Sequence, residues 1–319
     1  MQLLFQIVNR QSSIVISFPP SKRKRGFAWA RDLGKDSDVD DIQMLQRIAR
    51  TIRLDIIRMV GVGQKGHLGG SCSIADVVTA LYFHKMRHDP ANPSWPDRDR
   101  FLLSKGHAAL VQYAALAECG YFPKEELKKV KRCGAMLQGH PDLKTTPGIE
   151  ANTGSLGQGL SMACGIAAGL RIDGRASRVY CVVGDGELAE GQIWEAAMAA
   201  SAFKLDNLVA ILDRNGLQAM GAVAQRFNTN PLAEKWRAFG WHVVEIDGHD
   251  MSSILRALEE VDEIRKQPKM ILARTIKGAG IPFAENKVEF HNGQLDEAQF
   301  ESACACLAED PVGVERSGN

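Results

Sequence analysis

The chain has 319 residues, of which 45% are hydrophobic and 24% are charged, proportions ordinary for a globular protein large enough to bury a substantial core. The formal net charge is only +1, which gives no indication of a nucleic-acid partner, and the sequence contains no run of 18 apolar residues that would predict a membrane span. The seven cysteines are scattered and form no CxxC pair, so we interpret them as reduced thiols rather than as a disulfide framework or a zinc site.

Residues 1–40 are predicted to form a flexible extension, and residues 41–319 one folded domain. Residues 1–31 contain no acidic residue and include the run Lys22-Arg23-Lys24-Arg25. Because an Arg-rich and acid-poor composition is also typical of a transit peptide, that alternative stays open. A secretory signal fits badly, since the basic cluster follows the apolar stretch.

Apolar residues at helical spacing predict a first helix from about Asp41 to Gly61. A glycine-rich loop at residues 61–70 follows. A second helix is expected from Ile74 to about Met86, with Ser73 as its N-cap.

The middle of the chain is predicted to hold one short strand and several connections. The strand covers residues 101–103, and residues 104–107 form the turn into the next helix. A further short helix is expected at residues 125–132. Residues 134–155 look irregular, and a loop of this length inside a domain is typically functional.

From residue 156 onward, helices and buried strands alternate. The predicted helices are Leu156–Leu170, Glu190–Phe203 and Ser252–Arg265, and the predicted strands are Val179–Val183, Leu208–Leu212, Trp241–Ile246 and Met270–Ala273. The glycines of the first helix suggest that another backbone approaches it closely. Strands that alternate with helices form parallel βαβ units, so we expect an α/β domain with a doubly wound, mostly parallel sheet and helices on both faces.

Two polar residues follow neighbouring predicted strands. Asp185 lies in the loop Gly184–Gly191 after one strand, and Asn215 follows the next strand, thirty residues later. Because ligands collect at the carboxyl ends of parallel strands, both side chains are expected at one edge. Carboxylate and amide oxygens suit Mg²⁺ or Ca²⁺, which completes its shell with phosphate oxygens. Taken singly, each residue is better interpreted as a turn cap; taken as a pair, they predict a metal-bridged diphosphate.

The same loop also matches the G-x-G-x-x-G/A pattern of nicotinamide and flavin sites. In those sites the pyrophosphate lies directly on backbone amides. Here Asp185, Glu187 and Glu190 would repel it unless a cation intervened, and the ribose-binding acid is expected near Asp206, before the second strand rather than at its end. The dinucleotide site therefore remains the weaker alternative.

The Gly-Asp-Gly segment with its distant Asn215 resembles the thiamine-diphosphate motif, and roughly residues 42–295 resemble the cofactor-diphosphate half of transketolase. The resemblance is carried by segments that occur in family order: Gly66–Gly70, Ser104–His107, Gly139–Pro141, Thr153–Gly159, and Lys277-Gly278 with Glu285-Asn286 and His291. It implies a thiamine-diphosphate-binding fold of the diphosphate type.

The resemblance also implies roles for individual residues. Asp185 and Asn215 would bind Mg²⁺ (or Ca²⁺) through their side chains and Leu217 through its carbonyl, while Gly186 lets the backbone approach the diphosphate. Gly154 and Leu156 would contact the aminopyrimidine, and Glu190 would lie at a subunit interface. The catalytic set would be His107 and His291 near the diphosphate, His67 and His140 near the sugar hydroxyls, and Glu190. The remaining histidines, His84, His88, His242 and His249, are interpreted as structural or surface residues.

A full transketolase carries a pyrimidine-binding domain and a third domain after this one, whereas this sequence stops at Asn319. The chain therefore resembles the N-terminal subunit of a split transketolase, with a C-terminal partner subunit, an α2β2 assembly and a cytoplasmic location. The implied reaction is transfer of a two-carbon ketol unit from a ketose phosphate to an aldose phosphate, within pentose phosphate and carbohydrate metabolism. Alternatives are an unusual sugar phosphate, pyruvate as substrate, or a non-catalytic cofactor-binding subunit.

Overall fold

In this computed structural model the described residues are 38–308. The predicted extension therefore lies almost wholly outside the described residues. Its last three residues belong to helix α1 (Asp38–Val60), which begins a little before the predicted start near Asp41. Among residues 38–308, no helix has the length and apolar character needed to cross a membrane.

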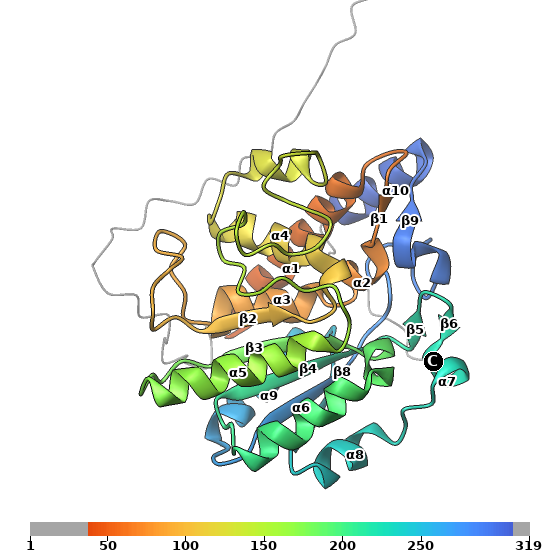
Figure 1. The fold of residues 1–319 in the computed structure, drawn as a ribbon. Coiled ribbons are helices and arrows are strands. Elements are labelled where there is room, and N and C mark those ends of the chain that lie inside the picture. The colour runs from red at the N-terminus through yellow and green to blue at the C-terminus, as the bar shows by residue number, and fades with distance from the viewer. Residues whose placement is uncertain (1–37, 309–319) are drawn as a thin grey trace, which may run out of the picture. The chain divides into compact units, whose positions relative to one another are not determined.

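A five-stranded sheet, parallel throughout, forms the centre of the domain (Figure 1). Its order is β2 (Arg100–Leu103), β3 (Val179–Gly184), β4 (Leu208–Arg214), β8 (Lys269–Arg274) and β7 (His242–Asp247). The three inner strands, β3, β4 and β8, are short and apolar, and most of their side chains are buried, as expected where both faces of a parallel sheet are covered. The edge strand β7 is more polar and has no fully buried residue. Gly184 pairs with Asp213, so β3 and β4 end side by side.

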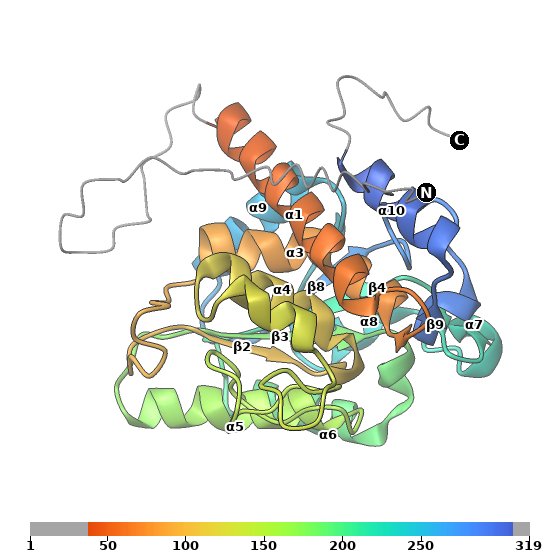
Figure 2. The ribbon, with the colours of Figure 1, turned by 90° about the horizontal axis from the view of Figure 1, so that it is seen from above.

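Helices cover both faces of this sheet, which confirms the predicted doubly wound α/β fold (Figure 2). Side chains alternate along each strand, so that Tyr180 and Val182 enter one core while Cys181 and Val183 enter the other. The helices that complete the first core are α1, α3 (Ala75–Ala80), α4 (Ala109–Cys119), α9 (Met251–Glu263) and α10 (Glu297–Ala308). The helices that complete the second core are α5 (Gln158–Ile172), α6 (Gly191–Ala202) and α8 (Leu232–Ala238).

Several short elements lie where the sequence predicted loops or gave no prediction. The loop at residues 61–70 contains β1 (Lys65–Gly66) and the start of α2 (Leu68–Cys72), and β1 pairs antiparallel with β9 (Gly293–Gln294). Further elements of this kind are the 3-10 segments η2 (Gly106–Ala108), η4 (Gly186–Ala189) and η5 (Val288–Asn292), the ribbon β5 (Leu217–Gln218) and β6 (Gly221–Ala222), and α7 (Val223–Arg226). Two short elements lie instead where helices were predicted. The π-helical turn η1 (Leu81–Lys85) continues α3 within the helix expected from Ile74 to Met86, and the 3-10 segment η3 (Lys124–Lys129) takes the place of the helix expected at residues 125–132.

The prediction that Ser73 caps the helix after it is wrong. The residue before α3 is Ile74, and the Ser73 hydroxyl instead donates to the buried Asp213 carboxylate at 2.7 Å. A serine that reaches a buried carboxylate gains a charge-assisted hydrogen bond that a helix cap does not offer. The close backbone approach expected along α5 occurs at Gly159, where a Cβ would lie 2.6 Å from Ser104 Cα, but not at Gly165 or Gly169.

All seven cysteines are free thiols, as the sequence indicated. Cys72, Cys164 and Cys181 are buried, whereas Cys133 and Cys306 are exposed.

Candidate active site

Asp185 and Asn215 lie at the same edge of the sheet, directly after β3 and β4. Asp185 Oδ1 accepts a hydrogen bond from the Gly186 amide at 2.8 Å, and Oδ2 accepts one from the Gly216 amide at 2.6 Å. Asn215 Oδ1 accepts from the Leu217 amide at 3.1 Å. The two side chains predicted to supply oxygen ligands to a metal therefore lie at the same edge, because two adjacent parallel strands end together.

Behind this edge lies a buried ion pair that the sequence did not predict. Asp213, which is fully buried, accepts from Lys105 Nζ at 2.5 Å, and Lys105 Nζ also donates to the Gly70 carbonyl at 2.6 Å. Ser73, Thr275 and Asn215 also donate to Asp213. Burial works to raise the pKa of Asp213, but Lys105 and the donor hydrogen bonds outweigh it and lower that pKa. This network fixes the orientation of Asn215.

A second buried lysine contacts the carbonyl that was predicted to bind metal. Lys277 Nζ donates to the Leu217 carbonyl oxygen at 3.1 Å. Burial, and then the nearby Lys105 ammonium, lower the pKa of Lys277 to about 8. For Asp185, burial and the neighbouring Asp213 raise the pKa to about 6. Both lysines lie in segments that carry the family resemblance, Ser104–His107 and Lys277-Gly278, but the sequence assigned neither of them a role.

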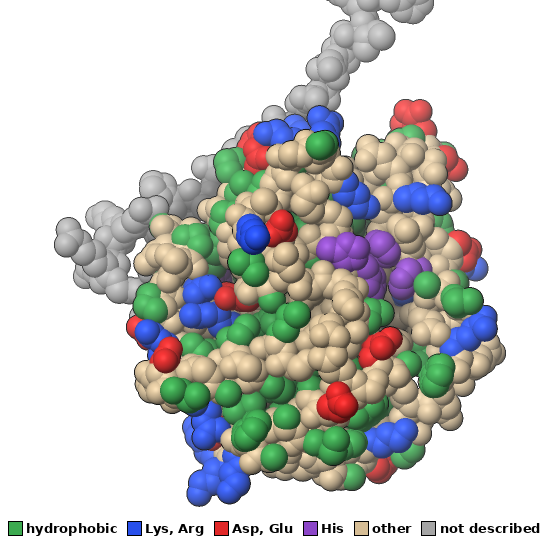
Figure 3. All heavy atoms as spheres, viewed as in Figure 1, with side chains coloured by type: hydrophobic (Ala, Val, Ile, Leu, Met, Phe, Trp, Pro, Cys, Tyr) green, Lys and Arg blue, Asp and Glu red, His purple; other side chains and the backbone are tan. Residues whose placement is uncertain are grey.

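Three of the four predicted histidines form one cluster beside these lysines. The ring centroids of His107 lie 5.1 Å from His291 and 5.2 Å from His67, and those of His67 and His291 are 5.5 Å apart. Figure 3 shows the histidine side chains gathered in one patch of this face. Burial is the main cause that lowers their pKa values, to about 4 for His67, about 2 for His107 and about 3 for His291. All three imidazoles are therefore neutral at physiological pH.

His140 lies at the outer side of this cluster and is exposed. It packs against Gly154, where φ is +144° and a Cβ would lie only 2.6 Å from His140 Cδ2. Only glycine combines this backbone conformation with this close contact. The two residues predicted to contact the aminopyrimidine, Gly154 and Leu156, are each partly buried.

The three acids of the Gly184–Gly191 loop, which the sequence analysis expected to repel a bare pyrophosphate together, point in different directions. Glu187 turns inward, where its carboxylate accepts from Ser104 Oγ at 2.5 Å and from the Gly157 amide at 2.8 Å. Glu190 is exposed at the start of α6 and contacts Gly157. Only Asp185 faces the strand edge, because the tight turn of η4 separates the three side chains.

Residues 44–312 match the family model for the transketolase, thiamine diphosphate binding domain. The chain is 47% identical over 270 residues to the 6-deoxy-6-sulfo-D-fructose transketolase subunit of Clostridium sp. strain MSTE9, covering 85% of this chain and 97% of that protein. It is 37% identical over 278 residues to an apulose-4-phosphate transketolase subunit of Phocaeicola vulgatus, covering 87% and 99%. The chain belongs to the transketolase family.

Longer transketolases share the same fold. The solved transketolase of Campylobacter jejuni gives a TM-score of 0.79 at 34% identity, over 85% of this chain and 44% of that one. This chain thus spans less than half of that enzyme but nearly all of the two subunits above. The matches confirm the predicted class, a thiamine-diphosphate-dependent subunit of a two-chain transketolase. The nicotinamide or flavin alternative is wrong.

The residues at the strand edge fit the cofactor of a transketolase. The two buried ammonium groups of Lys105 and Lys277 suit a diphosphate, and His291 Nδ1 is buried without a hydrogen-bond partner. No group of three or more His, Cys, Asp or Glu side chains within residues 38–308 could hold a metal ion by itself. A cation at Asp185 and Asn215 would therefore need ligands from a bound phosphate, as Mg²⁺ commonly does.

His249, which the sequence analysis gave no catalytic role, connects the loop that carries Lys277 to the first core. Its Nδ1 lies 2.8 Å from Asp76 Oδ2, and its Nε2 accepts from the Ile276 amide at 2.8 Å. Because Nε2 is the acceptor, Nδ1 carries the proton and donates to Asp76. Arg53 Nη1 donates to the other oxygen of Asp76 at 3.0 Å. His249 is thus structural, as expected, but it is part of a buried network rather than a surface residue.

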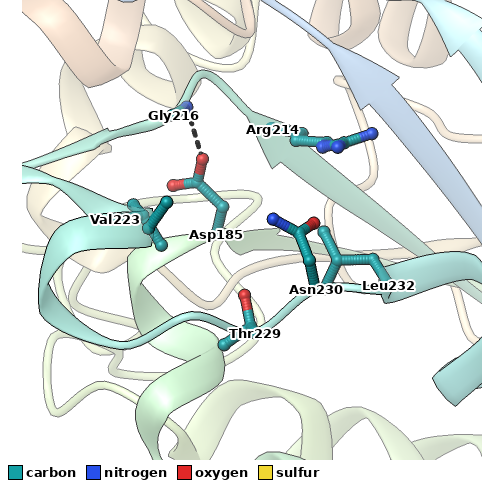
Figure 4. A pocket seen from close by; sticks show the side chains of 8 residues that line it. Asp185, Arg214, Gly216, Val223, Thr229, Asn230 and Leu232 are labelled. Carbon is teal, nitrogen blue, oxygen red and sulfur yellow. Dashed lines mark hydrogen bonds between the residues drawn. The ribbon is translucent and has the colours of Figure 1, made fainter.

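A cavity of about 140 Å³ opens beside Asp185 (Figure 4). In Figure 4 one carboxylate oxygen of Asp185 is bonded to Gly216. The lining residues come from the ends of β3 and β4 and from the segment that follows: Asp185, Arg214, Gly216, Val223, Ala224, Thr229, Asn230 and Leu232. The Asp185 carboxylate therefore borders a space that has room for a few water molecules.

The neutral histidines predict an acid-sensitive fold. The folded-state pKa of His67 is about 4, below its ordinary 6.5, so its stabilising contribution is present above pH 6.5 and is lost as the pH falls toward 4. When the pH is lowered from 7 to 5, we expect the free energy of unfolding of the wild type to fall by about 1 kcal/mol more than that of His67→Asn. This value includes a reduction for the partial exposure of the His67 side chain. Urea unfolding of both proteins at both pH values measures this; an equal drop would contradict it.

Proposed function

We propose that this chain and a C-terminal partner subunit together transfer a two-carbon ketol unit from a ketose to an aldose. The observation that carries the proposal is the convergence of Asp185, Asn215 and three neutral histidines at one strand edge. At its cofactor half-site this reaction requires oxygen ligands for a cation, buried ammonium groups for a diphosphate and uncharged imidazoles for a sugar.

The metal site we propose consists of the Asp185 and Asn215 side chains and the Leu217 carbonyl, which bind Mg²⁺ (or Ca²⁺). Bound thiamine diphosphate supplies a nucleophilic carbon and an electron sink. Lys277, whose ammonium already contacts the Leu217 carbonyl, would offset the charge of the diphosphate. Gly186 keeps the backbone accessible, and Gly154 with Leu156 would contact the aminopyrimidine ring.

We propose that the four histidines have different roles, according to their positions. His107 and His291 lie toward the buried lysines, which supports a role at the diphosphate, where the free His291 Nδ1 can make a hydrogen bond. His67 and the exposed His140 lie toward the outside, which supports contact with sugar hydroxyls. A neutral imidazole both donates and accepts, so each can bind a hydroxyl and move a proton at it.

The partner we propose carries the pyrimidine-type domain with its activating glutamate, in an α2β2 assembly. Two features support it: Glu190 is exposed beside the cofactor loop, and relatives of nearly the same length are named as subunits. We place the complex in the cytoplasm, where its seven free thiols would stay reduced.

Two donor classes fit this site. A ketose phosphate of the pentose phosphate reactions is the first. The 47% identity to a subunit named for 6-deoxy-6-sulfo-D-fructose favours an unusual anionic ketose as the second. Pyruvate fits less well, because it has no hydroxyl groups for His67 and His140.

A donor panel tests the proposal. The complex is incubated with thiamine diphosphate, Mg²⁺, an aldose acceptor and either fructose 6-phosphate, 6-deoxy-6-sulfo-D-fructose or pyruvate, and the products are identified by mass spectrometry. We expect a product two carbons longer than the acceptor from at least one ketose and none from pyruvate. No transfer from either ketose would sink the proposal.

A further inference from the structure

One buried carboxylate connects three separate segments of the candidate site. Glu187, in the 3-10 turn η4, is 2% exposed. Its Oε1 accepts from Ser104 Oγ at 2.5 Å and from the Gly157 amide at 2.8 Å, and its Oε2 accepts from the Gly184 amide at 3.1 Å. A side chain of the cofactor loop thus joins segments that are about eighty and thirty residues away in the chain.

Each donor belongs to a different part of the site. Ser104 follows β2 and leads into η2, which contains His107. Gly157 is the residue before α5, directly after the segment that we propose for the aminopyrimidine ring. Gly184 ends β3 and directly precedes Asp185. The carboxylate therefore lies between the proposed aminopyrimidine end and the proposed diphosphate end of the cofactor site.

The hydrogen bonds require an acceptor on both oxygens of this side chain. Two of the three donors are backbone amides, which cannot accept. Burial raises the pKa of Glu187, whereas the hydrogen bonds from Ser104, Gly157 and Gly184 act in the opposite direction. Glutamine has nearly the same size but carries one NH₂ group. In either orientation that group would face a backbone amide, so one of the two amide hydrogen bonds would be lost.

Two of the three segments are also packed backbone to backbone. A Cβ on Gly106 would lie 2.5 Å from the carbonyl carbon of Thr153, so the two chains touch without a side chain between them. Gly184 has no contact of this kind, because the atom nearest to a Cβ placed there belongs to a lysine side chain and is 3.6 Å away. The first two segments thus form one unit, and the Glu187 hydrogen bonds connect that unit to the end of β3.

On the basis of the function proposed above, we propose that Glu187 is a positioning residue that holds the aminopyrimidine segment in register with the Asp185 turn. It acts through the Gly157 and Gly184 amides rather than by contact with the cofactor. A ligand that spans both ends gains affinity only when the two ends are correctly spaced, whereas a ligand that binds at one end does not depend on that spacing.

The test therefore compares a ligand that spans the site with a ligand that fills one end. Thiamine diphosphate and inorganic pyrophosphate, each with Mg²⁺, are titrated by calorimetry into the complex of this chain with its partner subunit. We expect Glu187→Gln to weaken binding of thiamine diphosphate about tenfold, the scale typical of residues that hold a ligand-binding group in place. Binding of pyrophosphate should change by less than about twofold.

The matched control is Glu259→Gln, the same substitution at an exposed carboxylate of α9, which should bind both ligands like the wild type. An equal loss for both ligands in Glu187→Gln would overturn the proposal, because Glu187 would then only support the Asp185 turn. Unchanged binding of thiamine diphosphate would overturn it as well.

A second variant serves if Glu187→Gln does not fold. Ser104→Ala removes one donor and leaves the carboxylate with both amides. It should show the same selective loss for thiamine diphosphate, smaller in size. Equal affinities of Ser104→Ala and the wild type for thiamine diphosphate would then contradict the proposal.

A measurement without cofactor keeps this inference separate from the proposed function. If the wild-type complex binds no thiamine diphosphate, the proposed function fails, but the connection between the two segments is still measurable. Amide hydrogen exchange of residues 153–159 and 182–186 is followed by mass spectrometry in the ligand-free complex. We expect exchange about tenfold faster in at least one of these segments in Glu187→Gln, with α9 unchanged. Wild-type exchange in both segments would overturn the proposal.

Discussion

A polypeptide of these 319 residues, supplied with thiamine diphosphate and Mg²⁺ but no second chain, is expected to show no ketol transfer above background. The physical reason lies in how open the half-site is. His140 and Glu190, both assigned to the active site, are exposed, so water would surround the reacting groups. In high dielectric the contribution of hydrogen bonds and charges to catalysis is small. Adding the partner subunit should raise the rate by about a thousandfold or more, since it excludes water and supplies the second set of contacts.

A coupled assay of product formation, with the partner titrated into a fixed amount of this chain, measures the effect. The rate should saturate at a fixed ratio of the two chains. The partner alone serves as the control and should be equally inactive. Transfer by this polypeptide alone at a rate close to that of the complex would contradict the prediction.

Replacing Asp185 with Asn should abolish cofactor-dependent activity while leaving the fold intact. An amide keeps the size of the side chain but removes the charge that a divalent cation requires, and its NH₂ group cannot accept from the Gly186 or Gly216 amide. We expect the activity of the complex to fall by about three orders of magnitude. Loss of a residue that only hydrogen-bonds a metal ligand already lowers metal affinity or activity by about 10–100-fold, and loss of the ligand itself should lower it further. Calorimetry should detect binding of thiamine diphosphate with Mg²⁺ to the wild type and none to the variant at the same concentrations.

The matched control is Glu259→Gln, which removes one exposed carboxylate on α9, away from the strand edge. It should bind cofactor like the wild type. The far-UV circular dichroism of Asp185→Asn should also match, because Asp185 accepts only two backbone hydrogen bonds and their loss costs about 1–3 kcal/mol. Normal metal-dependent binding by Asp185→Asn would mean that the cation is held elsewhere.

The parts of the fold that follow a simple periodicity could be predicted. The buried strands after residue 178 and the helices between them have clear apolar patterns, so their parallel arrangement and the position of Asp185 at a strand end follow. Short elements could not be predicted, because α2 and the β1–β9 pair contain only a few residues each and carry no periodic signal. Their existence depends on packing between segments that are far apart in the chain, as the pairing of Lys65 with Gln294 shows.

Part of the candidate site could likewise be predicted from the sequence, and part could not. The sequence by itself determined which residue types are present: the Gly-Asp-Gly turn, the distant Asn215 and four histidines in glycine-flanked segments. Those are local features, fixed by spacing and by the chemistry of the side chains. Only the tertiary structure decided that His67, His107 and His291 meet, that Lys105 pairs with Asp213 and that Glu187 turns inward. The physical reason is that burial and long-range contacts set the charge, direction and partners of a polar side chain, and neither can be read from its neighbours in the sequence.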